Sequence, residues 1–143
     1  MALVHQGKVV VGNRTDEKPQ EVYWLENGGK IEPLGLSCEE VPVSEETIKE
    51  LGAIFLDCQK LQFPLKLRHW QKGDYFFPSG MKGKKKLSDF FIDQKMSKFE
   101  KDNTWLLCSG DDIVWVVGKR LDGRFLPNST SKHLLVLKLD PIS

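Results

Sequence analysis

Short apolar segments separated by turn residues are the feature that most constrains the fold of this chain. They are rich in Val, Leu, Trp and Phe, and Gly, Asn, Asp and Pro stand between them, which is typical of short β-strands. Gly28-Gly29 and Gly110-Asp111-Asp112 separate such segments and predict hairpin turns, the second between residues 105–109 and 113–118. The segments are KVVVG, EVYWLE, FPLKLRHW, DYFF, TWLLCS, DIVWVVG and HLLVLKL.

Helix signals are fewer than strand signals. Ser44 is a suitable N-cap for a helix over residues 45–51, because acids follow it where the helix dipole favours negative charge. A second helix is expected to start near residues 86–88, and Ser97 can begin a third short one. The pattern predicts a β-rich α+β fold, with short antiparallel strands in a sandwich or partly open barrel and two or three short helices.

Length and hydropathy set the scale of this fold. The chain has 143 residues, 40% of them hydrophobic, enough for one domain or two small ones. A boundary near Gly52 divides it into a small strand-rich N-terminal lobe, residues 1–55, and a second unit, residues 56–143. No apolar run approaches the roughly 20 residues of a membrane span, and the N-terminus lacks the features of a signal peptide, so we expect no membrane partner and a cytoplasmic protein.

Charge is distributed unevenly along the chain. The net charge is +1, but residues 64–101 hold ten Lys and Arg against four Asp and Glu, which makes this block strongly positive. Residues 1–63 are acidic to a similar degree. A basic block inside a nearly neutral chain predicts a local patch that suits a polyanionic partner.

The densest part of this block is PSGMKGKKKLSDFF, residues 78–91. We call residues 78–86 the lysine loop. Only two residues separate its glycines and no Ser or Thr follows the Gly-Lys pair, so it is not a nucleotide P-loop. Glycines that permit close approach and lysines at the start of a helix still suit a phosphate. The spacing of Leu87, Phe90 and Phe91 predicts one buried helix face beneath the loop. The alternative is a solvated lysine turn without a ligand.

Residues just before the loop have two possible uses. We expect Asp74 to neutralise Arg68 or a nearby lysine rather than to act in catalysis. The aromatic residues at alternating strand positions are more often core residues than platforms for nucleic-acid bases. They are Trp70, Tyr75, Phe76 and Phe77.

No catalytic constellation is visible in the sequence. Three widely spaced cysteines are expected to be reduced and at least partly buried, and the histidines lack the spacing of a zinc site. One enzymatic alternative is a hydrolase in which Cys58 or Cys108 meets His69 within hydrogen-bonding distance. We otherwise expect no catalytic, cofactor or metal residue in this chain.

Residues 56–125 resemble the C-terminal domain of tRNA(Ile)-lysidine synthetase. The resemblance lies in Leu-x-Arg68, Gly73-Asp74, Pro78-x-Gly80-Met81, Gly83-x-Lys85-Lys86-Leu87 and Phe90-Phe91-x-Asp93-x-Lys95, followed by the strand of residues 114–118 and Arg120. Many relatives have a proline and an arginine where this chain has Ser97 and Lys101. Lysine keeps the positive charge but lacks the bidentate fork of arginine.

The resemblance implies more than composition does. The full enzyme uses ATP, with Mg²⁺, to adenylate the wobble cytidine of the CAU-anticodon isoleucine tRNA, and lysine then displaces AMP. That chemistry belongs to an N-terminal domain with a Ser-Gly-Gly-x-Asp-Ser loop, which this sequence lacks; SGDD at residues 109–112 is not a version of it. The resemblance therefore implies a C-terminal fragment with Met1 as an artificial start. It also implies a fold related to a domain of the phenylalanyl-tRNA synthetase beta subunit.

In that family this region helps to hold the tRNA, so the expected partner is the isoleucine tRNA with a CAU anticodon. The second reading is an independent RNA- or protein-binding module whose basic loop binds another anion. The expected RNA-binding residues are Arg68, Lys72, Lys82, Lys84, Lys85, Lys86, Lys95, Lys98, Lys101 and Arg120.

Overall fold

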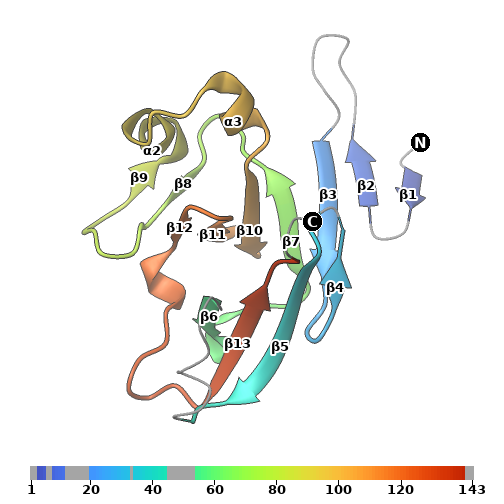
Figure 1. Cartoon of the computed structure of the whole chain (residues 1–143), viewed down its shortest axis with the longest axis vertical. Helices are drawn as coiled ribbons and strands as arrows, with labels where there is room; N and C mark the ends of the chain where they lie inside the picture. Colours follow the sequence, from blue (N-terminus) through green and yellow to red (C-terminus); the bar gives the residue numbers. More distant parts are fainter. Residues whose placement is uncertain (1–2, 6–7, 12–19, 33, 45–53, 141–143) are drawn as a thin grey trace.

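Two antiparallel sheets form most of the molecule (Figure 1). The computed structural model describes residues 3–5, 8–11, 20–32, 34–44 and 54–140. Sheet A has seven strands, and each neighbouring pair is antiparallel. In spatial order they are β1 (Leu3–His5), β2 (Lys8–Val11), β3 (Gln20–Leu25), β7 (Leu65–His69), β10 (Trp105–Ser109), β11 (Asp112–Val116) and β12 (Arg120–Leu121).

Sheet B has four strands, and its centre joins distant parts of the chain. The longest pairing runs between β5 and β13, from His133 opposite Pro42 to Lys138 opposite Ser37. In spatial order the strands are β4 (Lys30–Ile31), β5 (Leu36–Pro42), β13 (His133–Lys138) and β6 (Ile54–Asp57).

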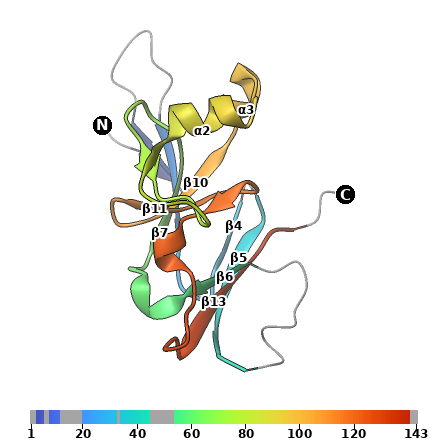
Figure 2. The ribbon, with the colours of Figure 1, turned by 90° about the vertical axis from the view of Figure 1, so that its left-hand side faces the viewer.

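A small ribbon and two α-helices lie at one end of the molecule, away from sheet B (Figures 1 and 2). The ribbon pairs β8 (Tyr75–Phe76) with β9 (Lys85–Lys86), and the lysine loop connects its strands. It leads directly into α2 (Leu87–Asp93), and α3 (Lys98–Asp102) follows. Two 3₁₀ helices, η1 (Cys58–Lys60) and η2 (Gly123–Phe125), complete the regular structure of the described residues.

Sheet A contributes side chains to two separate cores. The first core lies against sheet B and includes Leu67 and Leu107. The second core lies against α2 and includes Leu106, which neighbours Leu107 on β10. Because neighbouring residues of a strand point to opposite faces, both faces of β10 are buried. This explains why the TWLLCS segment is an unbroken apolar run rather than an alternating one.

The sequence predicts much of this fold. The β-rich antiparallel arrangement, the hairpin of β10 and β11, α2 and α3 are confirmed. The Gly28-Gly29 turn is present, since Gly29 N donates to Glu26 O at 2.9 Å, but the predicted hairpin is wrong. The strands on its two sides, β3 and β4, belong to different sheets. The predicted helix over residues 45–51 lies outside the described residues.

Two further expectations concern the chain as a whole. Both sheets combine strands from either side of residue 55, since β3 pairs with β7 and β5 pairs with β13. The division into a lobe of residues 1–55 and a second unit of residues 56–143 stays a prediction. Among the described residues, no helix has the length and apolar character needed to cross a membrane.

Candidate nucleic-acid interface

The lysine loop is a turn on a short β-ribbon. Tyr75 pairs with Lys86 and Phe76 with Lys85, so strand pairing holds the C-terminal end of the loop and closes the ribbon beneath it. Gly80 and Gly83 have φ values of +81° and +77°. No atom lies within 4 Å of the position that a Cβ would occupy at either residue. The left-handed backbone, not crowding, therefore favours glycine at both positions.

The helix that follows the loop is anchored in the second core. Leu87, Phe90 and Phe91 are buried, which confirms the apolar face that their spacing predicts. The Phe90 ring meets Phe76 edge to face at 5.2 Å between centroids, and the Phe91 ring meets Trp70 at the same distance. Edge-to-face contacts of this kind stabilise beyond the area that they bury. The loop is therefore connected to a rigid base.

A buried carboxylate fixes the other end of the loop. Asp122 is fully buried, and its Oδ2 accepts hydrogen bonds from Phe77 N and Arg124 Nη2, each at 2.9 Å. The hydrogen bonds that Arg124 donates to Asp122 raise the pKa of the Arg124 guanidinium. Ser79 N donates to Leu121 O at 2.9 Å. These bonds connect the start of the loop to the end of β12 and to the residues after it.

The loop lysines fall into two groups. Lys82, Lys84 and Lys86 are exposed, and no ion pair within the described residues involves them. Lys84 Nζ lies 4.6 Å from the centroid of the Tyr75 ring, a cation–π contact. Lys85 is instead half-buried and paired with Asp93 of α2. Three of the four predicted lysines therefore present their charge to solvent.

Arg68 has a structural contact. Its side chain is only 13% exposed, and its Nη1 and Nη2 each donate to one carboxylate oxygen of Asp74 at 2.9 Å. Burial alone would lower the pKa of Arg68, but the hydrogen bonds and charge of Asp74, with a contribution from Cys108, leave it raised. The predicted neutralising role of Asp74 is confirmed. Arg68 therefore does not belong to the exposed basic surface.

The remaining predicted residues differ in exposure. Arg120 Nη1 donates to Ser79 O at 3.1 Å, so this residue supports the lysine loop. Lys101 is half-buried, and its Nζ lies 6.0 Å from the centroid of the Trp70 ring. The exposed members are Lys72, Lys95 and Lys98.

The four aromatic residues named from the sequence, Trp70, Tyr75, Phe76 and Phe77, differ in how deeply they are buried. Phe76 is fully buried and Trp70 packs against the second core, as expected of core residues. Phe77 is half-buried beneath the Arg124 guanidinium, at 4.1 Å. Tyr75 is 46% exposed.

The most exposed aromatic ring of the described residues is Phe99 of α3, which the sequence interpretation missed. The sequence contained a signal for this exposure. Apart from Met96, which precedes the helix, no apolar residue lies three or four positions from Phe99, so Phe99 is not part of an apolar helix face.

The arrangement of the thiols does not support a hydrolase. All three cysteines are buried, and burial first of all raises the pKa of Cys58 and of Cys108 to about 11. Few thiolates would exist at neutral pH, and the thiolate is the nucleophile. His69 stacks on Trp105 at 3.7 Å, and its Nδ1 lies 3.1 Å from Thr104 O. In the pairing of β7 with β10, Cys108 lies opposite Lys66, three residues from His69, a separation of roughly 10 Å along a strand.

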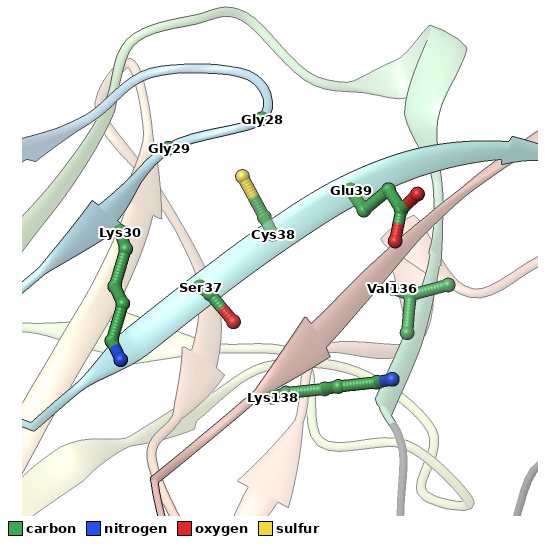
Figure 3. Close-up of a pocket in the computed structure, with 8 residues that line it drawn as sticks. All are labelled: Gly28, Gly29, Lys30, Ser37, Cys38, Glu39, Val136 and Lys138. Atoms are coloured by element: carbon green, nitrogen blue, oxygen red, sulfur yellow. The ribbon is translucent and has the colours of Figure 1, made fainter.

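A hollow of about 340 Å³ lies beside the Gly28-Gly29 turn, between β4, β5 and β13 (Figure 3). Cys38 points toward this turn, and its Sγ donates to Glu26 O at 3.2 Å. Lys30, on the rim, is paired with Asp140 at 2.8 Å. Across the described part of the chain, no three His, Cys, Asp or Glu side chains are grouped in a way that would hold a metal ion. The strongest candidate site is therefore the lysine surface.

The fold and this surface define a strand-rich domain with a rigid basic projection. A family model described as the TilS substrate C-terminal domain matches residues 65–137, which include the lysine loop, α2 and α3. The chain therefore belongs to the family of TilS C-terminal domains, TilS being the tRNA(Ile)-lysidine synthase.

Similar proteins agree with this assignment. The tRNA(Ile)-lysidine synthase of Parabacteroides distasonis is 49% identical over 123 residues, which are 85% of this chain and 28% of that protein. The enzyme of the same name from Bacteroides thetaiotaomicron is 43% identical over 64% of this chain and 21% of that protein. The chain thus spans about a quarter of the length of these relatives. A crystal structure of a TilS C-terminal domain has the same fold, with a TM-score of 0.68 at 22% identity over 85% of this chain and 98% of that one.

Proposed function

We propose that this domain holds tRNA through the surface formed by the lysine loop, α2 and α3. The observation that carries the proposal is the exposure of Lys82, Lys84 and Lys86, without ion pairs in the described residues, on a ribbon anchored in a buried core. Neighbouring like charges repel, and phosphate oxygens relieve that repulsion. Because the base of the loop is fixed, the loop loses little conformational entropy when it binds.

The proposed partner is the isoleucine tRNA with a CAU anticodon, as the names of the relatives suggest. We propose that the chain acts within an enzyme that ligates lysine to the wobble cytidine of this tRNA in the cytoplasm. ATP and Mg²⁺ would bind to a catalytic domain outside this chain. Lysine contacts to phosphates position an RNA without reading its sequence. Selection of the tRNA would then come from its shape and from the other parts of the enzyme.

Binding of tRNA to the full-length enzyme tests this proposal. The variant Lys82→Ala/Lys84→Ala/Lys86→Ala should bind roughly 100-fold more weakly at 0.1 M salt, if each lysine makes one phosphate contact. The matched control Lys30→Ala/Lys60→Ala/Lys132→Ala removes the same charge from sheet B and the segments beside it. It should bind almost as tightly as the unmodified enzyme. Equal losses in the two variants would contradict a specific role for the loop.

The second reading, an independent module for another anion, makes a different prediction. If the loop binds any polyanion equally, heparin should compete with tRNA as well as an unlabelled tRNA of equal charge does. Preference for the tRNA would favour the role within the synthase.

A further inference from the structure

Two exposed apolar residues flank the turn between α2 and α3. Ile92 is 69% exposed and Phe99 is 76% exposed, the highest values among the large hydrophobic residues of the described chain. Scattered exposed apolar residues are normal at protein surfaces. These two differ from scattered residues because they flank one tight turn, whose geometry is fixed on both sides.

The end of α2 is closed by a left-handed residue. Lys95 N donates to Ile92 O at 2.9 Å and Met96 N donates to Phe91 O at 3.0 Å, the two bonds of a Schellman motif. Lys95 occupies the position where glycine is usual, with φ of +56°. A residue with a Cβ is less stable in this conformation than glycine is. A lysine therefore stands at this turn despite a local conformational cost.

The start of α3 is fixed by a capping box. Ser97 Oγ accepts from Glu100 N, and Glu100 Oε1 accepts from Ser97 N, each at 3.1 Å. The hydrogen bond from the backbone of Ser97 lowers the pKa of the Glu100 carboxyl, which keeps it ionised and able to accept. At the other end, Asn103 Nδ2 donates to Phe99 O at 2.7 Å. The backbone that carries Phe99 is thus held at both ends of a five-residue helix.

The charges around the turn select the kind of partner. Lys95 and Lys98 are exposed, and Lys101 lies on the same short helix as Phe99. Residues 92–102 also hold three acids, but Asp93 pairs with Lys85 and Glu100 caps α3, so only Asp102 opposes these lysines without such a contact. An exposed aromatic ring among lysines complements a nucleic acid, since lysines contact phosphates while a ring stacks on a base. A base inside a duplex is covered by its neighbours, so the ring fits an unpaired or terminal base.

We propose that Phe99 stacks on an unpaired nucleobase of the bound RNA, with Ile92 packing at the edge of that base and Lys95 and Lys98 contacting the flanking phosphates. This surface on the α2–α3 turn adds to the contacts of the lysine loop. The proposal rests on the proposed function, because it requires that the domain binds RNA.

The test uses the full-length enzyme, tRNA and a blunt-ended RNA duplex of equal charge, which has no unpaired base. Phe99→Ala should weaken tRNA binding about 10-fold, within the range measured for one stacked base, and leave the slope of log affinity against log salt unchanged. Binding of the duplex should change less. Phe99→Trp should retain affinity and show fluorescence quenching on binding, after subtraction of the signal of the unmodified enzyme. The control Leu139→Ala removes an exposed apolar side chain outside this surface and should change nothing.

Three results would overturn this inference. If Phe99→Ala leaves tRNA affinity unchanged while the loop variant Lys82→Ala/Lys84→Ala/Lys86→Ala loses it, RNA binds but the ring does not stack. If Phe99→Ala lowers the melting temperature of the enzyme without changing tRNA affinity, the ring instead packs against another part of the protein. If neither Phe99→Ala nor the loop variant changes affinity, the proposed function fails together with the inference.

Discussion

The lysines of sheet B and those of the α2 side of the molecule differ in how many form ion pairs. In and beside sheet B, Lys30 pairs with Asp140 at 2.8 Å and Lys60 lies 3.9 Å from Asp57. On the α2 side most lysines have no ion pair within the described residues, although Lys85 pairs with Asp93. Both sides rest on sheet A through large buried cores. The difference is therefore in the surface charge and not in the packing beneath it.

This difference separates stability from binding. Exposed ion pairs contribute little to folding, typically less than 1 kcal/mol, so their small number among the described residues of the α2 side costs little stability. The second core, by contrast, should determine whether the lysines are held in place. Substitutions in the core and at the surface should consequently have different effects, and the following predictions test this.

The largest effect on stability is expected from Phe90→Ala. The change leaves a cavity in the second core and removes the contact with Phe76, and it should lower the free energy of unfolding by about 3 kcal/mol. Urea denaturation measures this loss. The matched control is Ile92→Ala on the exposed face of the same helix, which should cost less than about 0.5 kcal/mol. Similar losses for the two variants would show that α2 is not anchored as described.

A smaller loss is expected from Asp122→Ala. This change leaves the Phe77 amide and the Arg124 guanidinium without their buried acceptor, which should cost about 2 kcal/mol. Asp112→Ala removes only an exposed carboxylate 3.5 Å from Arg124 and should cost less than about 0.5 kcal/mol. Thermal unfolding compares the two variants. Equal costs would mean that Asp122 does not fix the base of the lysine loop.

Lys95→Gly should raise stability and lower RNA affinity. Glycine relieves the left-handed backbone at the end of α2, and the free energy of unfolding should rise by about 1 kcal/mol. The control Lys95→Ala removes the same charge but keeps a side chain at positive φ, so its stability should stay near that of the unmodified chain. Both variants should bind RNA equally weakly. A stability loss with Lys95→Gly would contradict the conformation described here.

The sequence predicted strands with continuous apolar runs but missed those that depend on distant partners. β5 contains Glu39 and Glu40 in succession, so its pattern lacks the alternation of a strand. Its pairing with β13, nearly a hundred residues later, is what defines it. β9 and β12 have two residues each, too few for a periodic pattern. α2 and α3 were predictable because apolar spacing and Ser97 act locally.

For the candidate site, the sequence predicted which residues are basic but not which are free to bind. The pairing of Lys85 with Asp93 depends on how β9 enters α2. The bidentate contact between Arg68 and Asp74 requires the turn after β7. The sequence interpretation considered stacking only for the aromatic residues before the loop and favoured a core role for them, whereas the most exposed ring belongs to Phe99. Exposure depends on the completed fold, so residue type alone could not rank these candidates.

The salt dependence of tRNA binding by the full-length enzyme tests the central claim most directly. The variant Lys82→Ala/Lys84→Ala/Lys86→Ala should change the free energy of unfolding by less than about 0.5 kcal/mol. Its plot of log affinity against log salt should be flatter than that of the unmodified enzyme by about 2 to 3, since each lost phosphate contact removes roughly 0.7 to 0.9. The control Lys30→Ala/Lys60→Ala/Lys132→Ala should keep the original slope. An unchanged slope and affinity in the loop variant would contradict the account and leave the lysine loop as a solvated turn.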